Sequence, residues 1–234
     1  MWTRFFIFVF QKEKRMFHLR QFQVRPLILT LLLISLFVGV QPFTAQAASP
    51  NIVISQIYGG GGNASAPLRN DFVELFNRGT TIVALSGWSV QYASATGTGN
   101  FGGNPVVALT GSLAPGQYYL VQLSSGGANG ALLPTPDATG TIAMSATGGK
   151  VALVSSATGL ACNGGSTPCN AAQLALIVDL IGYDGANFYE GAPTPALSNT
   201  TAALRASNGC TDSDNNAADF SVGAPTPQIG RAHV

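Results

Sequence analysis

Residues 51–90 read NIVISQIYGGGGNASAPLRNDFVELFNRGTTIVALSGWSV, and this stretch decides the fold class. It holds three short runs of β-branched and aromatic residues, separated by a glycine-rich loop and an Asn-Arg-Gly turn. Such apolar runs, bounded by Gly, Asn and Asp, are typical of strands. The stretch therefore predicts strands over 52–58, 71–76 and 81–85, with another beginning at 86–90.

The same alternation of short apolar runs and turns continues to residue 207. Residues 113–116, Leu-Ala-Pro-Gly, suit a type II turn, and residues 124–140 form a Gly/Pro-rich loop. The Ala-Thr-Gly-Gly sequence at 146–149 indicates a hairpin. Strands at this spacing predict one all-β sandwich without repeat or linker. Its further strands are expected over 105–109, 117–123, 141–144, 150–154, 176–183 and 201–207.

The four glycines at 59–62 follow the first expected strand. Consecutive glycines can form an anion-binding nest of backbone amides. However, no Gly-Lys-Ser/Thr and no helical pattern follow them, as a phosphate-binding loop would require. The pattern favours a flexible loop between strands.

The charges are few and unevenly placed. Only 9% of the 234 residues are charged, and six of the eleven basic residues precede position 26. From Ala48 onward five basic residues stand against nine acidic ones, a balance of −4. Binding of nucleic acid rests on Lys and Arg that neutralise phosphates. The body of the chain thus gives no evidence for direct nucleic-acid binding.

The first 47 residues have the layout of a secretory signal peptide. Arg20 and Arg25 precede the apolar run PLILTLLLISLFVGV at 26–40, and Ala45-Gln46-Ala47 follows as a small-x-small cleavage site. The run is shorter than the ~20 residues of a membrane span. Met16 is an alternative start, and an uncleaved anchor is the alternative to cleavage. We expect an extracellular or cell-surface protein without a membrane span after cleavage.

The body of the chain lacks the residues of common catalytic sites. The two histidines are His18 and His233, outside the expected sandwich, so no general base or zinc ligand of that type is available. Asp71 and Glu74 are three apart in a strand and therefore face opposite sides, which suits no paired acid–base chemistry. A structural hydrogen bond, or for Glu74 an ion pair with Arg78 or Arg205, is expected instead. We predict no catalytic set and no enzyme in this chain.

Near the end, the oxygen-bearing residues of TDSDNNAADF alternate as in calcium loops. The sequence fails the EF-hand pattern, because Ala217 stands where glycine is required and Gly223 where glutamate is. A partial calcium site is one interpretation, and a solvated Asx turn without any cofactor is the one favoured. The candidate ligands are Asp212, Asp214, Asn216 and Asp219.

Three cysteines remain to be placed. In an oxidising compartment Cys162 and Cys169 could close a small loop, which leaves Cys210 unpaired, and other pairings stay open. The final IGRAHV departs in composition from the body. We therefore expect a domain over 48–227, a non-native or truncated tail over 228–234, and a parent chain that continues.

The motifs, in their order, resemble the lamin tail domain family in its bacterial secreted form. They are DFVELFN at 71–77, LSGWSV at 85–90, LAPGQYYLV at 113–121, GKVALV at 149–154, VDLIGY at 178–183 and the late Leu204-Arg205. SQIYGGGGN at 55–63 and GCTDSDNNAADFSVGAPTP at 209–227 are similar to modules at the start of large secreted nucleases.

This resemblance implies an immunoglobulin-like β-sandwich with a non-catalytic role. It implies a binding, positioning or anchoring module beside other domains, with an unidentified protein or cell-envelope partner. The alternative is the accessory N-terminal region of an extracellular endonuclease/exonuclease/phosphatase-type nuclease whose catalytic domain lies elsewhere. The resemblance assigns fold-signature roles, not catalytic ones, to Asp71, Glu74, Asn77, Gly87 and Trp88.

Overall fold

The computed structural model describes residue 49 and residues 51–228, which form a β-sandwich of two larger sheets and one small one. The short helices in this part are η1 (Phe101–Gly103), α2 (Ala171–Leu174), η2 (Ser207–Gly209) and α3 (Asn216–Asp219). The strands are β1 (Ile52–Tyr58), β2 (Phe72–Asn77), β3 (Val83–Ala84), β4 (Ser89–Ser94), β5 (Val107–Ala108), β6 (Ser112–Leu113), β7 (Tyr118–Gln122), β8 (Ala138–Thr139), β9 (Gly149–Val154), β10 (Ile177–Tyr183), β11 (Ala202–Arg205) and β12 (Phe220–Gly223).

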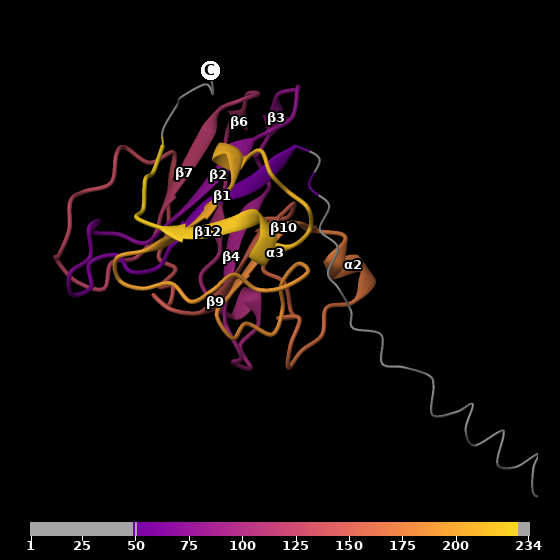
Figure 1. Cartoon of the computed structure of the whole chain (residues 1–234). Helices are drawn as coiled ribbons and strands as arrows, with labels where there is room; N and C mark the ends of the chain where they lie inside the picture. Colours follow the sequence, from indigo (N-terminus) through magenta and orange to yellow (C-terminus); the bar gives the residue numbers. More distant parts are fainter. Residues whose placement is uncertain (1–48, 50, 229–234) are drawn as a thin grey trace, which may run out of the picture. The chain divides into compact units, whose positions relative to one another are not determined.

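The strand order places the first strand in the middle of the larger sheet. That sheet runs β12-β11-β1-β2-β7-β8, and the opposing sheet runs β10-β9-β4-β5, with β3 and β6 as a separate pair (Figure 1). All pairings of named strands are antiparallel except that of β7 with β8. The arrangement confirms the predicted all-β sandwich.

The main core lies between the two large sheets. It takes side chains from β1, β2 and β7 on one side and from β4, β9 and β10 on the other. Further apolar clusters cover the outer faces, one beneath the loops around Cys162 and one around Tyr58 and Phe72. Burying one large apolar side chain contributes about 1.5–3 kcal/mol. Cover on both faces explains why the strands read as nearly continuous apolar runs.

Two β-bulges lie in β1 and β10, which both contribute residues to the candidate site. The pairing of β1 with β2 shifts between Ile54 and Gln56, and that of β10 with β9 shifts between Ile177 and Asp179. A bulge frees backbone groups from the ladder and re-aims side chains. Accordingly, the N–H of Ile54 donates to the carboxylate of Asp179, and the carbonyl of Ile54 accepts from Arg205 Nε at 2.8 Å.

Several local predictions were wrong. Residues 141–144 form no strand and no hairpin with β9, which pairs with β4 and β10 instead. Their apolar pattern reflects burial of Ile142 and Met144 in the core rather than a ladder. The expected strand at 81–85 is reduced to Val83–Ala84. The sequence pattern also gave no sign of β6, β8, α3 or β12.

The glycine-rich loop is buried and held in place, unlike the flexible connection expected. Gly59, Gly60, Gly61 and Gly62 are all buried. The N–H of Gly61 donates to Asp71 Oδ1 at 2.8 Å, and the N–H of Gly62 donates to the carbonyl of Leu68 at 3.0 Å. Glycine is needed here because other backbone segments pass too close for a side chain.

Within residues 49 and 51–228, no helix is both long and apolar enough to cross a membrane. The predicted signal peptide and its cleavage site, together with residues 229–234, lie outside the described residues.

Candidate functional site

The last described residues, 224–228, which we call the C-terminal strap, contact side chains of the six-stranded sheet. The carboxamide of Gln56 pairs with Thr226 as a strand residue would: its Nε2 donates to the carbonyl at 3.2 Å, and its Oε1 accepts from the N–H at 2.7 Å. The N–H of Gln228 donates to Glu74 Oε2. A hollow of about 100 Å³ adjoins these contacts and is lined also by Tyr118.

The bulge in β1 positions Glu74 for its contact with Gln228. Because the register shifts there, Gln56 lies opposite Glu74. Ser55 Oγ, at the bulge, donates to Glu74 Oε1 at 2.7 Å. Glu74 is only 1% exposed, and burial raises its pKa to about 7 against the hydrogen bonds that lower it. The expected ion pair with Arg78 or Arg205 is not formed among the described residues, since both guanidiniums pair with aspartates.

Arg205 lies at the centre of a buried cluster of carboxylates, which we call the Arg205 cluster. Its Nη2 is 2.7 Å from Asp179 Oδ2, and its Nη1 is 3.1 Å from Asp212 Oδ1 and 3.7 Å from Asp219 Oδ2. The guanidinium also lies 4.4 Å from the centre of the Phe220 ring. Burial alone would lower the pKa of Arg205, but the carboxylates outweigh it and raise the pKa, so the side chain stays charged.

The Asn216 side chain forms four hydrogen bonds that link α3 to β10 and to Glu190. Its Oδ1 accepts from the N–H groups of Gly182 and Glu190 at 2.9 and 3.2 Å. Its Nδ2 donates to the carbonyl of Leu180 at 2.8 Å and to Glu190 Oε2 at 3.2 Å. The amide is therefore fully used by the fold, although the sequence makes Asn216 a candidate calcium ligand.

The other three candidate calcium ligands do not face a common point, because two of them bind other protein groups and the third lies in a turn. Asp219 accepts from the N–H and the hydroxyl of Ser213, at 2.9 and 2.6 Å. Asp212 contacts Arg205 and Arg78 instead of facing Asp219 across an ion. Asp214 has a positive φ of 54° and marks the turn. The structure thus brings Asp212 and Asp219 together around an arginine, a role that sequence reasoning missed.

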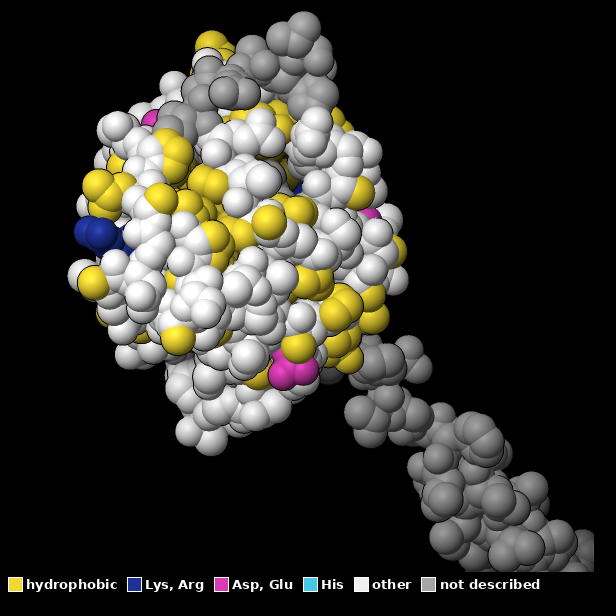
Figure 2. Space-filling view, turned by 60° about the vertical axis from the view of Figure 1, so that its left-hand side comes forward, with side chains coloured by type: hydrophobic (Ala, Val, Ile, Leu, Met, Phe, Trp, Pro, Cys, Tyr) yellow, Lys and Arg dark blue, Asp and Glu magenta, His cyan; other side chains and the backbone are white. Residues whose placement is uncertain are grey.

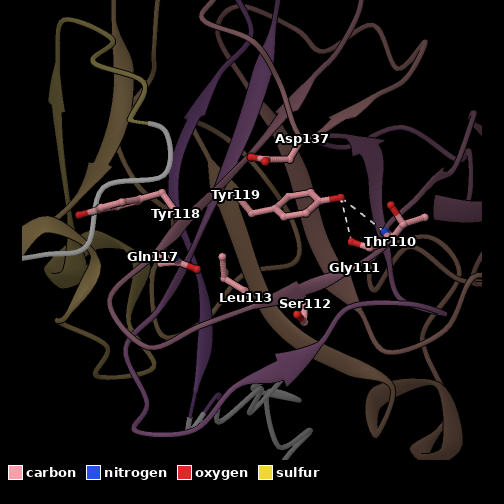
Figure 3. A pocket seen from close by; sticks show the side chains of 8 residues that line it. All are labelled: Thr110, Gly111, Ser112, Leu113, Gln117, Tyr118, Tyr119 and Asp137. Carbon is pink, nitrogen blue, oxygen red and sulfur yellow. Dashed lines mark hydrogen bonds between the residues drawn. The ribbon is translucent and has the colours of Figure 1, made fainter.

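An open depression of about 360 Å³ lies between β6 and β7 (Figure 3). The ring of Tyr119 crosses it, and the hydroxyl donates to the carbonyl of Thr110 at 3.2 Å, whereas Tyr118 points the other way. Asp137 Oδ2 accepts from the N–H of Leu120 at 2.8 Å. The Tyr119 hydroxyl and the Asp137 carboxylate are each held by a backbone group, and they present no paired acid and base.

The comparisons with known proteins agree with this geometry. A model of the Lamin Tail Domain family matches residues 45–209. The chain belongs to the lamin tail domain family. The match includes β1, β2 and Arg205 but ends before Asp212, Asn216 and the C-terminal strap. The match therefore covers the sandwich up to η2, but neither β12 nor the contacts made by residues 210–228.

One solved structure supports the fold assignment for this lamin tail domain. It is the crystal structure of a DUF4876 family protein from Bacteroides thetaiotaomicron, with a TM-score of 0.51 and 14% sequence identity. The similarity covers 79% of this chain and 74% of that one, and at this identity it shows the fold alone. No match to a curated protein was found.

The residues that the sequence resemblance marks as fold signatures lie in turns and in the core. Asn77 is fully buried, donates to the carbonyls of Thr81 and Leu113 at 2.9 and 2.7 Å, and accepts from the N–H of Gly79. Gly87 has a φ of 88°, which glycine adopts without strain, and the half-buried Trp88 contacts the main core. These contacts are structural.

A disulfide and a buried lysine organise the loops over the four-stranded sheet. Cys162 and Cys169 are joined, and Cys210 is exposed with a free thiol. Lys150 Nζ, beneath the disulfide loop, donates to the carbonyl of Asn163 at 2.9 Å and to Asn187 Oδ1 at 2.8 Å. Burial lowers the pKa of Lys150 to about 8.

The face in Figure 2 carries few charged side chains among polar and apolar ones. Such a face offers little electrostatic attraction to a polyanion.

The stability of the sandwich is expected to fall as the pH rises. Burial raises the pKa of Asp71 and of Glu74 to about 7, above their ordinary values of 3.8 and 4.5. Between these values the folded state holds protons that the unfolded state has lost. The stability from these groups is therefore full below about pH 4, declines up to about pH 7 and levels off above it. One pKa unit corresponds to about 1.4 kcal/mol.

Urea unfolding at several values between about pH 5 and pH 8 tests this expectation. Asp71→Asn is expected to flatten the decline, whereas Asp184→Asn, at an exposed position, leaves it unchanged. An unfolding free energy that rises with pH over this range would contradict the assignment.

Proposed function

We propose that this lamin tail domain is a secreted, non-catalytic positioning module that fixes the direction of the chain attached to it. The contact of the C-terminal strap with Gln56 and Glu74 carries the proposal. Gln56 and Glu74 are buried side chains of adjacent strands, and both bind main-chain groups of the strap. Such contacts set the path of the chain whatever its side chains are, as in β-strand addition.

Rigid placement is favoured by the position of β1 and β2. Both strands lie inside the six-stranded sheet and are paired on both sides. Side chains anchored on a rigid sheet position a ligand better than side chains on a loop. Downstream domains of the parent protein, or a protein or cell-envelope partner, would then be held in a defined orientation.

A reporter attached after Gln228 tests the proposal. With a small rigid domain fused there, we expect the reporter to tumble together with the sandwich, as measured by fluorescence anisotropy decay. In the double variant Gln56→Ala/Glu74→Ala the reporter should tumble independently, while Gln122→Ala on β7 should have no effect. Independent tumbling in the unmodified protein would refute the proposal.

The absence of catalysis is part of this proposal. Asp71 and Glu74 accept hydrogen bonds from backbone or hydroxyl groups, and Arg205 neutralises aspartates. These contacts leave no acid paired with a base among them. Residues 48–228 should give no hydrolysis of DNA, RNA or phosphoesters above a buffer blank with Mg²⁺ or Ca²⁺, and turnover would overturn this part.

Secretion rests on the leader alone. The apolar run at 26–40 and Ala45-Gln46-Ala47 favour cleavage after residue 47. N-terminal sequencing of the protein recovered from the medium should begin at Ala48, and a retained leader would support an anchor instead.

A second candidate is the accessory region of an extracellular endonuclease/exonuclease/phosphatase-type nuclease. The observation that favours it is the resemblance of SQIYGGGGN at 55–63 and of GCTDSDNNAADFSVGAPTP at 209–227 to modules of such proteins. Sequencing the gene past codon 228 separates the two: a nuclease domain supports this candidate, and adhesion-type repeats support a surface protein.

A further inference from the structure

Three carboxylates converge beside Arg205 from three parts of the chain. Asp179 comes from β10, Glu190 from the loop after it, and Asp212 from the loop after η2. One oxygen from each lies within 4.8 Å of the others. Ligand oxygens around a single ion are separated by about this distance or less, since each lies 2.3–2.6 Å from calcium.

The charges in this region do not balance. Asp219 adds a fourth carboxylate, 3.7 Å from Arg205. Against these stand Arg205 and Arg78, the latter 3.5 Å from Asp212 Oδ2 and 24% exposed in its side chain. The buried region therefore holds more negative than positive charge. Buried charge without a partner is costly, so a further positive charge is expected there.

One atom of the cluster lacks any partner. Glu190 is 0% exposed, and its Oε1 is buried without a hydrogen bond among the described residues. Its Oε2 is fixed by Asn216 Nδ2 at 3.2 Å. An unsatisfied buried carboxylate oxygen beside two other carboxylates is the arrangement of an incomplete coordination sphere.

We propose that Asp179, Glu190 and Asp212 form a binding site for a hard divalent cation of the calcium class. The donors are all oxygens, which calcium and magnesium prefer over softer metals. The set differs from the four residues that the sequence pattern indicates, and shares only Asp212 with it. The cation would link β10 to the loops on either side of β11 and complete the charge balance around Arg205.

A proton on Glu190 is the competing way to remove the excess charge. Burial, together with the neighbouring Asp179, raises the pKa of Glu190 well above its ordinary value despite the opposing effect of Arg205. Asp212 and Asp214 act in the same direction. A proton and a cation make opposite predictions for Glu190→Gln, which imitates the protonated side chain.

The test uses the whole purified chain, stripped with a chelator and then titrated with Ca²⁺ or Mg²⁺. We expect one Ca²⁺ per chain by equilibrium dialysis and a rise of the melting temperature by several degrees at millimolar Ca²⁺. Glu190→Gln should fold, lose the bound ion and lose the thermal shift. Asp184→Asn, at an exposed position, is the matched control and should keep both.

Two outcomes would overturn the proposal. One is a folded, chelator-treated protein that takes up no Ca²⁺ or Mg²⁺ at millimolar concentration, which would leave the proton as the neutralising group. The other is an unchanged ion stoichiometry in Glu190→Gln. If that variant does not fold, the stoichiometry of the unmodified protein still decides between ion and proton, and Asp212→Asn replaces it as the second variant.

Discussion

Arg205→Met is expected to lower the free energy of unfolding by about 3–5 kcal/mol, the usual effect of removing one partner from a buried ion pair. The guanidinium contacts Asp179 and Asp212 at 2.7 and 3.1 Å, and its Nε donates to the carbonyl of Ile54. The side chain is 0% exposed. Methionine would fill similar volume but leave the carboxylates without their cation.

Urea unfolding at neutral pH measures this effect. Arg69→Met is the matched control, because Arg69 is exposed and forms no ion pair among the described residues, and it should change stability by less than about 0.5 kcal/mol. A loss for Arg205→Met no larger than that of the control would mean that the cluster does not support the fold. At low pH the loss should shrink, since burial raises the pKa of Asp179 and its protonated form no longer needs the cation.

Gly61→Ala is expected to destabilise the sandwich by about 3 kcal/mol, at the upper end of what overpacking costs. A Cβ at this position would lie 2.0 Å from the carbonyl carbon of Asn70 and 2.2 Å from the nitrogen of Asp71. Both are backbone atoms, so no side-chain rotation relieves the clash. The shift would also strain the hydrogen bond from Gly61 to Asp71.

Gly103→Ala is the control for Gly61→Ala. A Cβ at Gly103 meets nothing within 4 Å, so stability should change by less than about 0.5 kcal/mol. Thermal melting of both variants measures the difference. Equal melting temperatures would show that the glycine-rich loop is as adaptable as its composition suggested.

The fold was predictable because most of its long strands coincide with apolar runs that can be recognised locally in the sequence. β1, β2, β7, β9 and β10 lie close to where their apolar runs placed them. The strand predicted at 141–144 was wrong because alternating apolar residues indicate burial, and a buried segment need not pair with another strand. The flexible loop predicted at 59–62 was also wrong. Glycine permits flexibility, but it also permits close packing, and only the tertiary contacts distinguish these two cases.

The candidate site was predictable only in fragments. The sequence marks Asp212 and Asp219 as oxygen ligands and Glu74 as a signature residue, but it does not show that a bulge at Ser55 turns Glu74 and Gln56 toward the strap. Nor does it link Arg205 to Asp179, because 26 residues separate them. Glu190 carries no local signal, since its surroundings come from other segments.

The place of β1 in the sheet has a consequence for the order of folding. This strand leaves the ribosome first among the described elements, yet it lies between β2 and β11, and Ile54 bonds to Arg205, 151 residues later. Pairings of such long range are slow to form, because chain entropy is lost before they do. The sandwich therefore cannot close during synthesis until β11 has emerged.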